Sequence, residues 1–165
     1  GLRCTIISGT LPVMSVKTKA LSEKLVHVAR AQPVCVPEET PLREALVVMR
    51  YRQVPCLLVT KGGKLTGIFT ERDFLMKAAG KPCSGSVGEQ MSRKPVIATL
   101  GETVGEAVEE MNAKGLRNLP LVDESGAPAS VVTVSSLIRY LADHFPAEVV
   151  NLPPHPQRAA ETDGA

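Results

Sequence analysis

Four consecutive residues offer the clearest chemistry in this chain: Thr70, Glu71, Arg72 and Asp73. A carboxylate in the first turn of a helix can accept hydrogen bonds from a ligand, while the Thr hydroxyl and the free helix N–H groups can face a phosphate. The same spacing can also serve the fold alone, because Thr followed three residues later by an acidic residue is a capping arrangement. Acidic residues favour the first helical turn in any case. Taken alone, the four residues leave both interpretations open.

The other reactive side chains are not arranged for catalysis or for metal binding. The cysteines are Cys4, Cys35, Cys56 and Cys83, and the histidines are His27, His144 and His155. The cysteines form no Cys-x-x-Cys pair, and no His stands at metal-ligand spacing. No Ser-His-Asp or Cys-His arrangement and no converging carboxylates are indicated. We therefore expect neither an enzyme nor a metal site, and the free thiols are typical of a reducing cytoplasm.

The surrounding sequence is duplicated. Residues 33–49 match residues 95–111 at an offset of 62, and residues 56–75 match residues 119–138 at an offset of 63. A repeat this long indicates a duplicated structural unit. Two similar units stacked together create two related clefts, which favours a binding architecture over a catalytic one.

Composition excludes several classes of function. The chain has 165 residues, so one domain or two small units can share a core. Aromatic residues make up 3% and the net charge is +2, which argues against nucleic-acid binding by base stacking or by phosphate contacts. No apolar stretch approaches the ~18 residues that a membrane span needs.

Each repeat predicts the element order β-α-β-β-α. The expected strands are 34–36, 56–59 and 65–69, then 96–98, 119–122 and 130–133. The expected closing helices are 71–79 and 135–144. Thr40 is a plausible N-cap of the helix between the first two strands, and Thr103 with Glu106 forms a capping box in the second copy. A helix over 18–29 and a helical turn near 87–91 are also expected.

These elements divide the chain into four segments. Residues 1–17 are expected to be a flexible N-terminal segment, with Met14 a candidate initiator. Residues 18–80 form repeat 1 with its preceding helix, and residues 81–144 form the linker and repeat 2. Residues 145–165 form a Pro-rich C-terminal tail.

The segments GIFTERD (67–73), EQMSRKPV (89–96) and LRNLPLVDESG (116–126) resemble a tandem pair of CBS domains, also called a Bateman module. The resemblance covers about residues 30–144. It implies an α/β (α+β) fold of two repeats, with small mixed sheets packed face to face in pseudo-two-fold symmetry. It also implies a non-catalytic regulatory module that needs no cofactor and binds AMP, ADP, ATP or S-adenosylmethionine. Such modules form homodimers and are often attached to a protein that they regulate.

The resemblance assigns a ribose-binding role to Thr70 and Asp73, since both ribose hydroxyls can donate to one carboxylate. In repeat 2, Thr133 is kept but Ser136 stands where the carboxylate is expected. Hydrogen bonds to a charged group contribute about 1.5–3 kcal/mol. We therefore predict one competent site, in repeat 1. Ser130, which replaces Gly67, is expected to narrow the second cleft.

The resemblance also places the adenine and the phosphates. The adenine slot would be formed by Val34, Cys35, Val54, Pro55 and Cys56 in repeat 1, and by Val96, Ile97, Asn118, Leu119 and Pro120 in repeat 2. Arg72 and Arg117 are the candidates for phosphate binding. The alternatives are that the apolar residues are sheet core and that the arginines are surface charges. Ser136 and Asn118 also motivate a second hypothesis, a structural dimerisation scaffold with vestigial clefts.

Overall fold

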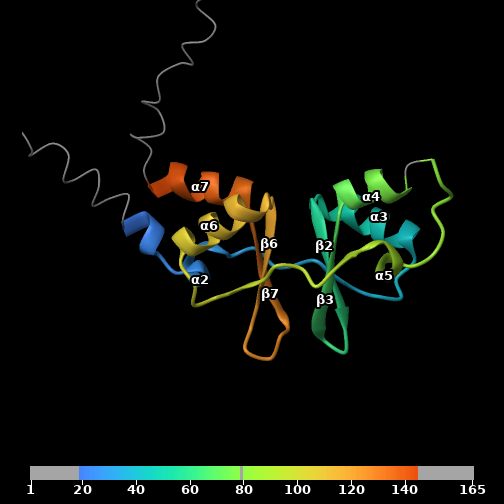
Figure 1. Cartoon of the computed structure of the whole chain (residues 1–165), viewed down its shortest axis with the longest axis horizontal. Helices are drawn as coiled ribbons and strands as arrows, with labels where there is room; N and C mark the ends of the chain where they lie inside the picture. Colours follow the sequence, from blue (N-terminus) through green and yellow to red (C-terminus); the bar gives the residue numbers. More distant parts are fainter. Residues whose placement is uncertain (1–18, 79, 145–165) are drawn as a thin grey trace, which may run out of the picture.

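The computed structural model describes residues 19–78 and 80–144, which form two similar units side by side (Figure 1). The first unit contains β1 (Cys35–Pro37), α3 (Leu42–Arg52), β2 (Cys56–Lys61), β3 (Lys64–Thr70) and α4 (Glu71–Ala78). The second contains β5 (Ala98–Thr99), α6 (Val104–Lys114), β6 (Asn118–Val122), β7 (Pro128–Thr133) and α7 (Val134–His144). The predicted β-α-β-β-α order is confirmed in both.

Each unit is built on a small mixed sheet of the same topology. The first strand is parallel to the second, and the second and third form an antiparallel hairpin. The first sheet has the order β1-β2-β3-β4, and the second has the order β5-β6-β7. Strand β4 (Ser92–Arg93), which lies in the linker and pairs with Gly67 and Ile68, was not predicted. Two residues are too few to show the alternation that marks a strand.

Both cores are mainly aliphatic, although the first also contains the fully buried Phe69, and one face of α3 or α6 closes each core. The spacing of Leu42, Ala45, Leu46 and Met49 at i, i+3, i+4 and i+7 predicts one buried face for α3, and of these Leu42, Ala45 and Met49 are buried. Leu46 is only half-buried, and its counterpart Val108 on α6 is 39% exposed. The buried stripe is therefore narrower than predicted, and part of each helix face remains open.

The two units exchange a short helix. Helix α2 (Leu25–Val28) and helix α5 (Val87–Gln90) stand 62 residues apart, at equivalent places in the repeat. Leu25 is fully buried in the core of the second unit, and Val87 is fully buried in the core of the first. Equivalent bridges accompany them: Lys24 pairs with Thr103, and Ser86 pairs with Pro41. The helix that precedes repeat 1 in sequence thus closes the other unit in space.

This exchange explains where the expected helix over 18–29 is wrong. Residue 18 lies outside the described residues, and the helix is broken at Glu23 and Lys24. At the break, the carbonyl of Glu23 accepts a hydrogen bond from Val104 N at 2.9 Å, and Leu25 N donates to Glu102 O at 2.8 Å. Pairing with the second unit therefore replaces the helical hydrogen bonds.

Helix capping differs between the repeats. Pro41, not Thr40, is the N-cap of α3, and no side chain caps that helix. The carbonyl of Thr40 instead accepts a hydrogen bond from Val87 N at 2.8 Å. The capping box of Thr103 and Glu106 on α6 is confirmed. The hydrogen bonds from the Thr103 N–H and hydroxyl lower the pKa of Glu106.

The sheets meet at the centre of the molecule. Cys56, Leu58 and Ile68 form a small buried cluster against Val131 of the second sheet. Leu65 N donates to Gly126 O at 3.0 Å across the same boundary. Ser130 is 1% exposed and donates through Oγ to Ala31 O at 2.8 Å. Ser130 therefore holds the chain segment that enters the first unit.

No helix in residues 19–78 and 80–144 is long and apolar enough to cross a membrane.

Because Leu25 fills the core of the opposite unit, Leu25→Ala should lower the free energy of unfolding by about 2–5 kcal/mol. Unfolding should remain a single transition, because the units share their cores. Urea denaturation followed by circular dichroism measures both. Val26→Ala is the matched control, since Val26 is 47% exposed, and it should change stability by less than about 0.5 kcal/mol. A Leu25→Ala effect as small as that of the control would contradict the exchange.

Candidate functional site

The junction of β3 and α4 holds the motif that the sequence singled out. Thr70 N and Thr70 Oγ1 both donate to Asp73 Oδ2 at 3.0 Å, and Asp73 N donates to Thr70 Oγ1 at 3.1 Å. These reciprocal bonds confirm the capping interpretation of the motif. They use one carboxylate oxygen and leave the other, Oδ1, for a different partner.

Residues from outside the motif contact that second oxygen. Ser92 Oγ in β4 donates to Asp73 Oδ1 at 3.1 Å, and Lys77 Nζ lies 3.6 Å from the same atom. Lys77 Nζ also donates to the carbonyls of Gln90 at 2.7 Å and Met91 at 3.4 Å. The linker thus lies over the carboxylate, and the Asp73 side chain is 15% exposed. Sequence reasoning missed Ser92 and Lys77, although the i, i+4 spacing of Asp73 and Lys77 was a usable signal.

Gly67 allows the linker to approach this closely. A Cβ built on Gly67 would stand 2.2 Å from Met91 Sδ and 2.9 Å from Met91 Cγ, closer than nonbonded atoms approach. Met91 itself is buried in the core of the first unit. The missing side chain at Gly67 therefore makes room for the residue that anchors the linker beside Asp73.

The second unit keeps the cap and lacks the charge. Thr133 N donates to Ser136 Oγ at 2.9 Å, and Ser136 N donates to Thr133 Oγ1 at 3.0 Å. The single hydroxyl proton of Ser136 is donated to Thr133 O at 2.8 Å. The two junctions have the same local geometry, but only the first offers a carboxylate.

The predicted adenine residues of the first unit lie beside its junction. Cys56 pairs with Thr70 in the hairpin, and the carbonyl of Pro55 accepts a hydrogen bond from Glu71 N at 3.3 Å. Cys35 pairs with Leu58, two residues further along β2. The structure brings Val54, Pro55 and Cys56 next to the motif, with Val34 and Cys35 on the neighbouring strand.

The second unit repeats this arrangement. Asn118 pairs with Thr133, and the carbonyl of Arg117 accepts a hydrogen bond from Val134 N at 3.1 Å. Val96 and Ile97 directly precede β5. Burial separates the predicted residues: Cys56, Leu119 and Pro120 are buried, whereas Cys35, Pro55, Arg72, Ile97 and Arg117 are exposed and the rest are half-buried. The three buried side chains can offer a ligand only their backbone groups.

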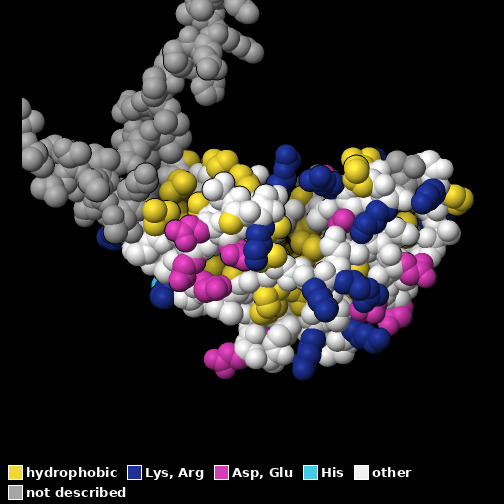
Figure 2. All heavy atoms as spheres, in the orientation of Figure 1, with side chains coloured by type: hydrophobic (Ala, Val, Ile, Leu, Met, Phe, Trp, Pro, Cys, Tyr) yellow, Lys and Arg dark blue, Asp and Glu magenta, His cyan; other side chains and the backbone are white. Residues whose placement is uncertain are grey.

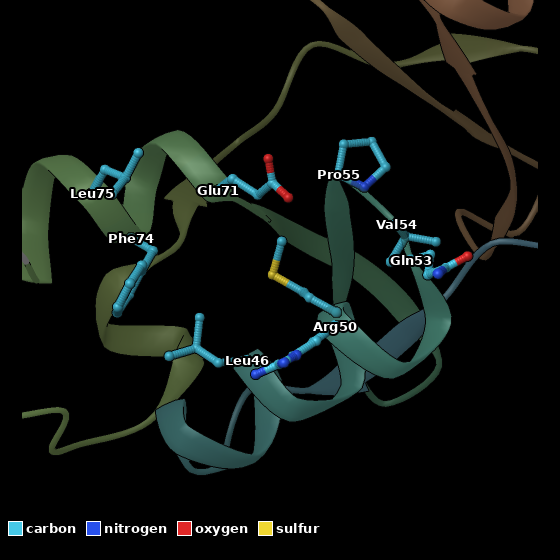
Figure 3. Close-up of a pocket in the computed structure, with 9 residues that line it drawn as sticks. Leu46, Arg50, Gln53, Val54, Pro55, Glu71, Phe74 and Leu75 are labelled. Atoms are coloured by element: carbon cyan, nitrogen blue, oxygen red, sulfur yellow. The ribbon is translucent and has the colours of Figure 1, made fainter.

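Two hollows contain parts of the predicted set. A pocket of about 710 Å³ lies between α3 and α4 (Figure 3), and Leu46, Met49, Phe74 and Leu75 are among its apolar lining residues. Val54 and Pro55 line it, with Arg50 and Glu71 as its charged groups. A smaller one of about 390 Å³ is lined by residues of both units: Lys64, Leu65, Thr66, Lys94, Pro95, Ile97, Val122 and Gly126. Neither is lined by Thr70 or Asp73, so the motif and the open space are separate.

Within residues 19–78 and 80–144, no three His, Cys, Asp or Glu side chains are grouped so that they could hold a metal ion.

The family model for the CBS domain matches residues 25–80 and 85–143. The chain belongs to the CBS domain family. It contains a tandem pair, and each matched range includes one of the exchanged helices, α2 or α5.

Sequence relatives of this CBS pair are mostly longer proteins. It is 33% identical over 103 residues to an inosine-5′-monophosphate dehydrogenase of Thermoplasma acidophilum, covering 62% of this chain and 20% of that enzyme. It is 30% identical over 106 residues to a protein of Methanopyrus kandleri, covering 62% of this chain and 54% of that protein. The chain therefore spans about half or less of the length of these relatives.

Solved structures confirm the fold. The CBS domain of a membrane protein from Sphaerobacter thermophilus superposes with a TM-score of 0.69 at 22% identity, covering 79% of this chain and 95% of that one. A CBS domain protein from Pyrobaculum aerophilum, complexed with AMP, gives 0.65 at 19% identity, covering 73% and 99%. A CBS domain pair in complex with 5′-methylthioadenosine and S-adenosyl-L-methionine gives 0.67 at 20% identity, covering 73% and 97%.

Burial at the junction also affects Cys56. Desolvation raises the pKa of this thiol from 9.0 to about 11. Its protonated form is therefore favoured in the folded state, and the associated stability is present below pH 9 and lost as pH rises from 9 to 11. Urea unfolding at pH 8, 9.5 and 11 should show a fall that is smaller in Cys56→Ala. An equal fall in both proteins would contradict the assignment to Cys56.

Proposed function

We propose that this CBS pair is a regulatory module that senses an adenosine-containing ligand of the AMP, ADP, ATP or S-adenosylmethionine type. The ligand would bind mainly at the first unit. The observation that carries the proposal is the Asp73 carboxylate at the β3–α4 junction, which has no charged counterpart in the second unit. The AMP and S-adenosyl-L-methionine complexes of structural neighbours support this ligand class.

Binding of a ribose at Asp73 requires an exchange of hydrogen bonds. Oδ1 accepts from Ser92 Oγ, and Lys77 Nζ stands nearby, so ribose hydroxyls must displace these donors or share the carboxylate with them. Ser92 belongs to β4, which is only two residues long and begins the path into the second unit. A ligand that takes over the carboxylate therefore weakens the tie between β4 and α4. The linker would then have two arrangements, one with β4 tied to α4 and one with this tie weakened. A ligand that binds the second arrangement more tightly would shift the position of one unit relative to the other.

The remaining residues of the site have supporting roles. Val34, Cys35, Val54 and Pro55 would contact the adenine, while Cys56 would contribute its backbone. Arg72 is exposed on the first turn of α4 and would meet a phosphate. The proposal includes no catalytic step and no required cofactor.

A second candidate function is a structural dimerisation scaffold with vestigial clefts. The observation that favours it is the internal use of Asp73: both carboxylate oxygens are hydrogen-bonded within the protein, and the side chain is 15% exposed. A carboxylate already satisfied in this way contributes to the fold without any ligand.

We further propose that the module is a homodimer and that it regulates a partner protein. Large apolar side chains stand exposed on the helices of both units: Val47, Tyr51, Leu75, Met76, Val108, Val134, Ile138 and Leu141. Apolar faces of this kind mark interaction surfaces. The relatives that exceed this chain in length include inosine-5′-monophosphate dehydrogenases, which supports an enzyme as the regulated partner.

A thermal-shift panel with AMP, ADP, ATP and S-adenosylmethionine tests the sensing proposal. At 100 times its dissociation constant, a ligand stabilises the native state by about 2.7 kcal/mol and raises the melting temperature by several degrees. Asp73→Asn keeps an oxygen for the Thr70 cap and removes the charge, so it should abolish most of this shift. Ser136→Ala is the matched control in the second unit and should leave the shift unchanged. No shift with any compound would favour the scaffold.

Ser92→Ala tests the proposed competition at Oδ1. The substitution removes a donor that the ribose must displace, and an ordinary hydrogen bond contributes about 0.5–1.5 kcal/mol. The dissociation constant measured by calorimetry should therefore fall by about two- to tenfold. Ser84→Ala, a change in the exposed linker, is the control. Weaker binding by Ser92→Ala would show that Ser92 assists the ligand rather than competes with it.

A further inference from the structure

We propose that two copies of this chain pair head to tail, so that α3 and α4 of one copy lie against α6 and α7 of its partner. This inference rests on the homodimer of the proposed function and specifies its orientation. It is independent of the ligand.

The surfaces to be covered lie on the helix side of both units. In Figure 1, α4 and α7 lie along the same edge of the molecule, opposite the hairpin turns. Leu75 on α4 is 63% exposed, and its repeat counterpart Ile138 on α7 is 59% exposed. Tyr51 on α3 is 85% exposed. Because apolar side chains are exposed in both units, a second copy can bury them whether the two chains pair head to tail or head to head.

The distribution of charge distinguishes the head-to-tail dimer from the head-to-head dimer. Residues 31–94 of the first unit contain ten Lys or Arg and six Asp or Glu, a net charge of +4. Residues 95–144 of the second contain three Lys or Arg and seven Asp or Glu, a net charge of −4. Residues 19–30 pack on the second unit and contain three basic residues and one acidic residue. With this segment included, the net charge of the second unit is −2. Figure 2 shows Lys and Arg mostly over the first unit, whereas Asp and Glu are visible over both units.

The same asymmetry is present on the helices themselves. Helix α3 carries three arginines against Glu44, a net charge of +2, and α6 carries three glutamates against Lys114, a net charge of −2. Helices α4 and α7 each carry equal numbers of basic and acidic residues, with His144 neutral. The contrast therefore lies between α3 and α6.

A head-to-head dimer places α3 against α3 and α6 against α6, with like charges facing each other. A head-to-tail dimer places α3 against the partner's α6 twice, so both contacts are attractive. Surface charges interact over about 10 Å at an ionic strength of ~0.1 M, and salt screens them. Charge complementarity fixes orientation more than it contributes affinity.

The first unit also offers a receptor for an apolar side chain. The pocket of about 710 Å³ between α3 and α4 is lined by Leu46, Met49, Phe74 and Leu75 (Figure 3). In the head-to-tail pairing, α7 of the partner passes this pocket, and its exposed Ile138 is a side chain of suitable size and polarity.

Charge reversal on the full chain tests the orientation by sedimentation velocity. One variant carries Arg50→Glu with Arg52→Glu on α3, a second carries Glu109→Lys with Glu110→Lys on α6, and a third combines all four changes. In the head-to-tail dimer, each of the first two should raise the dimer dissociation constant about tenfold, because two pairs are lost at each of two contacts. The combined variant should return to within about threefold of wild type.

The salt dependence of dimerisation by the wild-type chain is a second test of the orientation, and it needs no variant. Raising the ionic strength from about 50 mM to about 500 mM should weaken a head-to-tail dimer, whereas it should leave a head-to-head dimer unchanged or strengthen it. A monomeric wild type would overturn both the homodimer and its orientation. A dimer that neither salt nor the first two variants weaken would overturn the orientation alone. Neither outcome bears on nucleotide binding, which the thermal-shift panel measures separately.

Discussion

The reciprocal exchange of α2 and α5 between the units is the constraint on which the rest of this structure depends. Each unit is a small sheet with two helices, and neither core is complete within its own repeat. Leu25 enters the second core from the N-terminal side, and Val87 enters the first core from the linker. Backbone hydrogen bonds accompany these side-chain contacts: Leu25 N donates to Glu102 O and Val87 N donates to Thr40 O, each at 2.8 Å. The two units therefore hold each other in register.

The linker connects this constraint to the candidate site. Only a few residues separate Val87, which closes the first core, from Ser92, which donates to the carboxylate of Asp73. Between them, Met91 is buried against Gly67, whose missing side chain leaves the required space. In the proposed function, a ligand at Asp73 would therefore act on a segment that is already fixed at one end in the core. Ligand binding and the relative position of the units would then be coupled through a few residues of the linker rather than over a long path.

The sequence predicts much of the fold, because the duplicated pattern indicates each helix and strand twice, once in each repeat. The spacing of Leu42, Ala45 and Met49 marks a buried helix face, and the capping box of Thr103 and Glu106 marks where a helix begins. The exchange could not be read from the sequence, since periodicity shows that Leu25 is apolar but not which core receives it. Strand β4 was too short to produce a pattern. At the site, Thr70 and Asp73 were found by their spacing, whereas Ser92 reaches Asp73 from 19 positions along the chain.

The difference between the β3–α4 and β7–α7 junctions can be tested most directly by counting the ligand sites on each chain. Calorimetric titration of the full chain with AMP, and separately with S-adenosylmethionine, measures the number of sites per chain. One site per chain is expected for the ligand that binds, because Ser136 cannot replace the carboxylate that Asp73 supplies. Two equal sites per chain, or one site whose affinity is unchanged in Asp73→Asn, would contradict it.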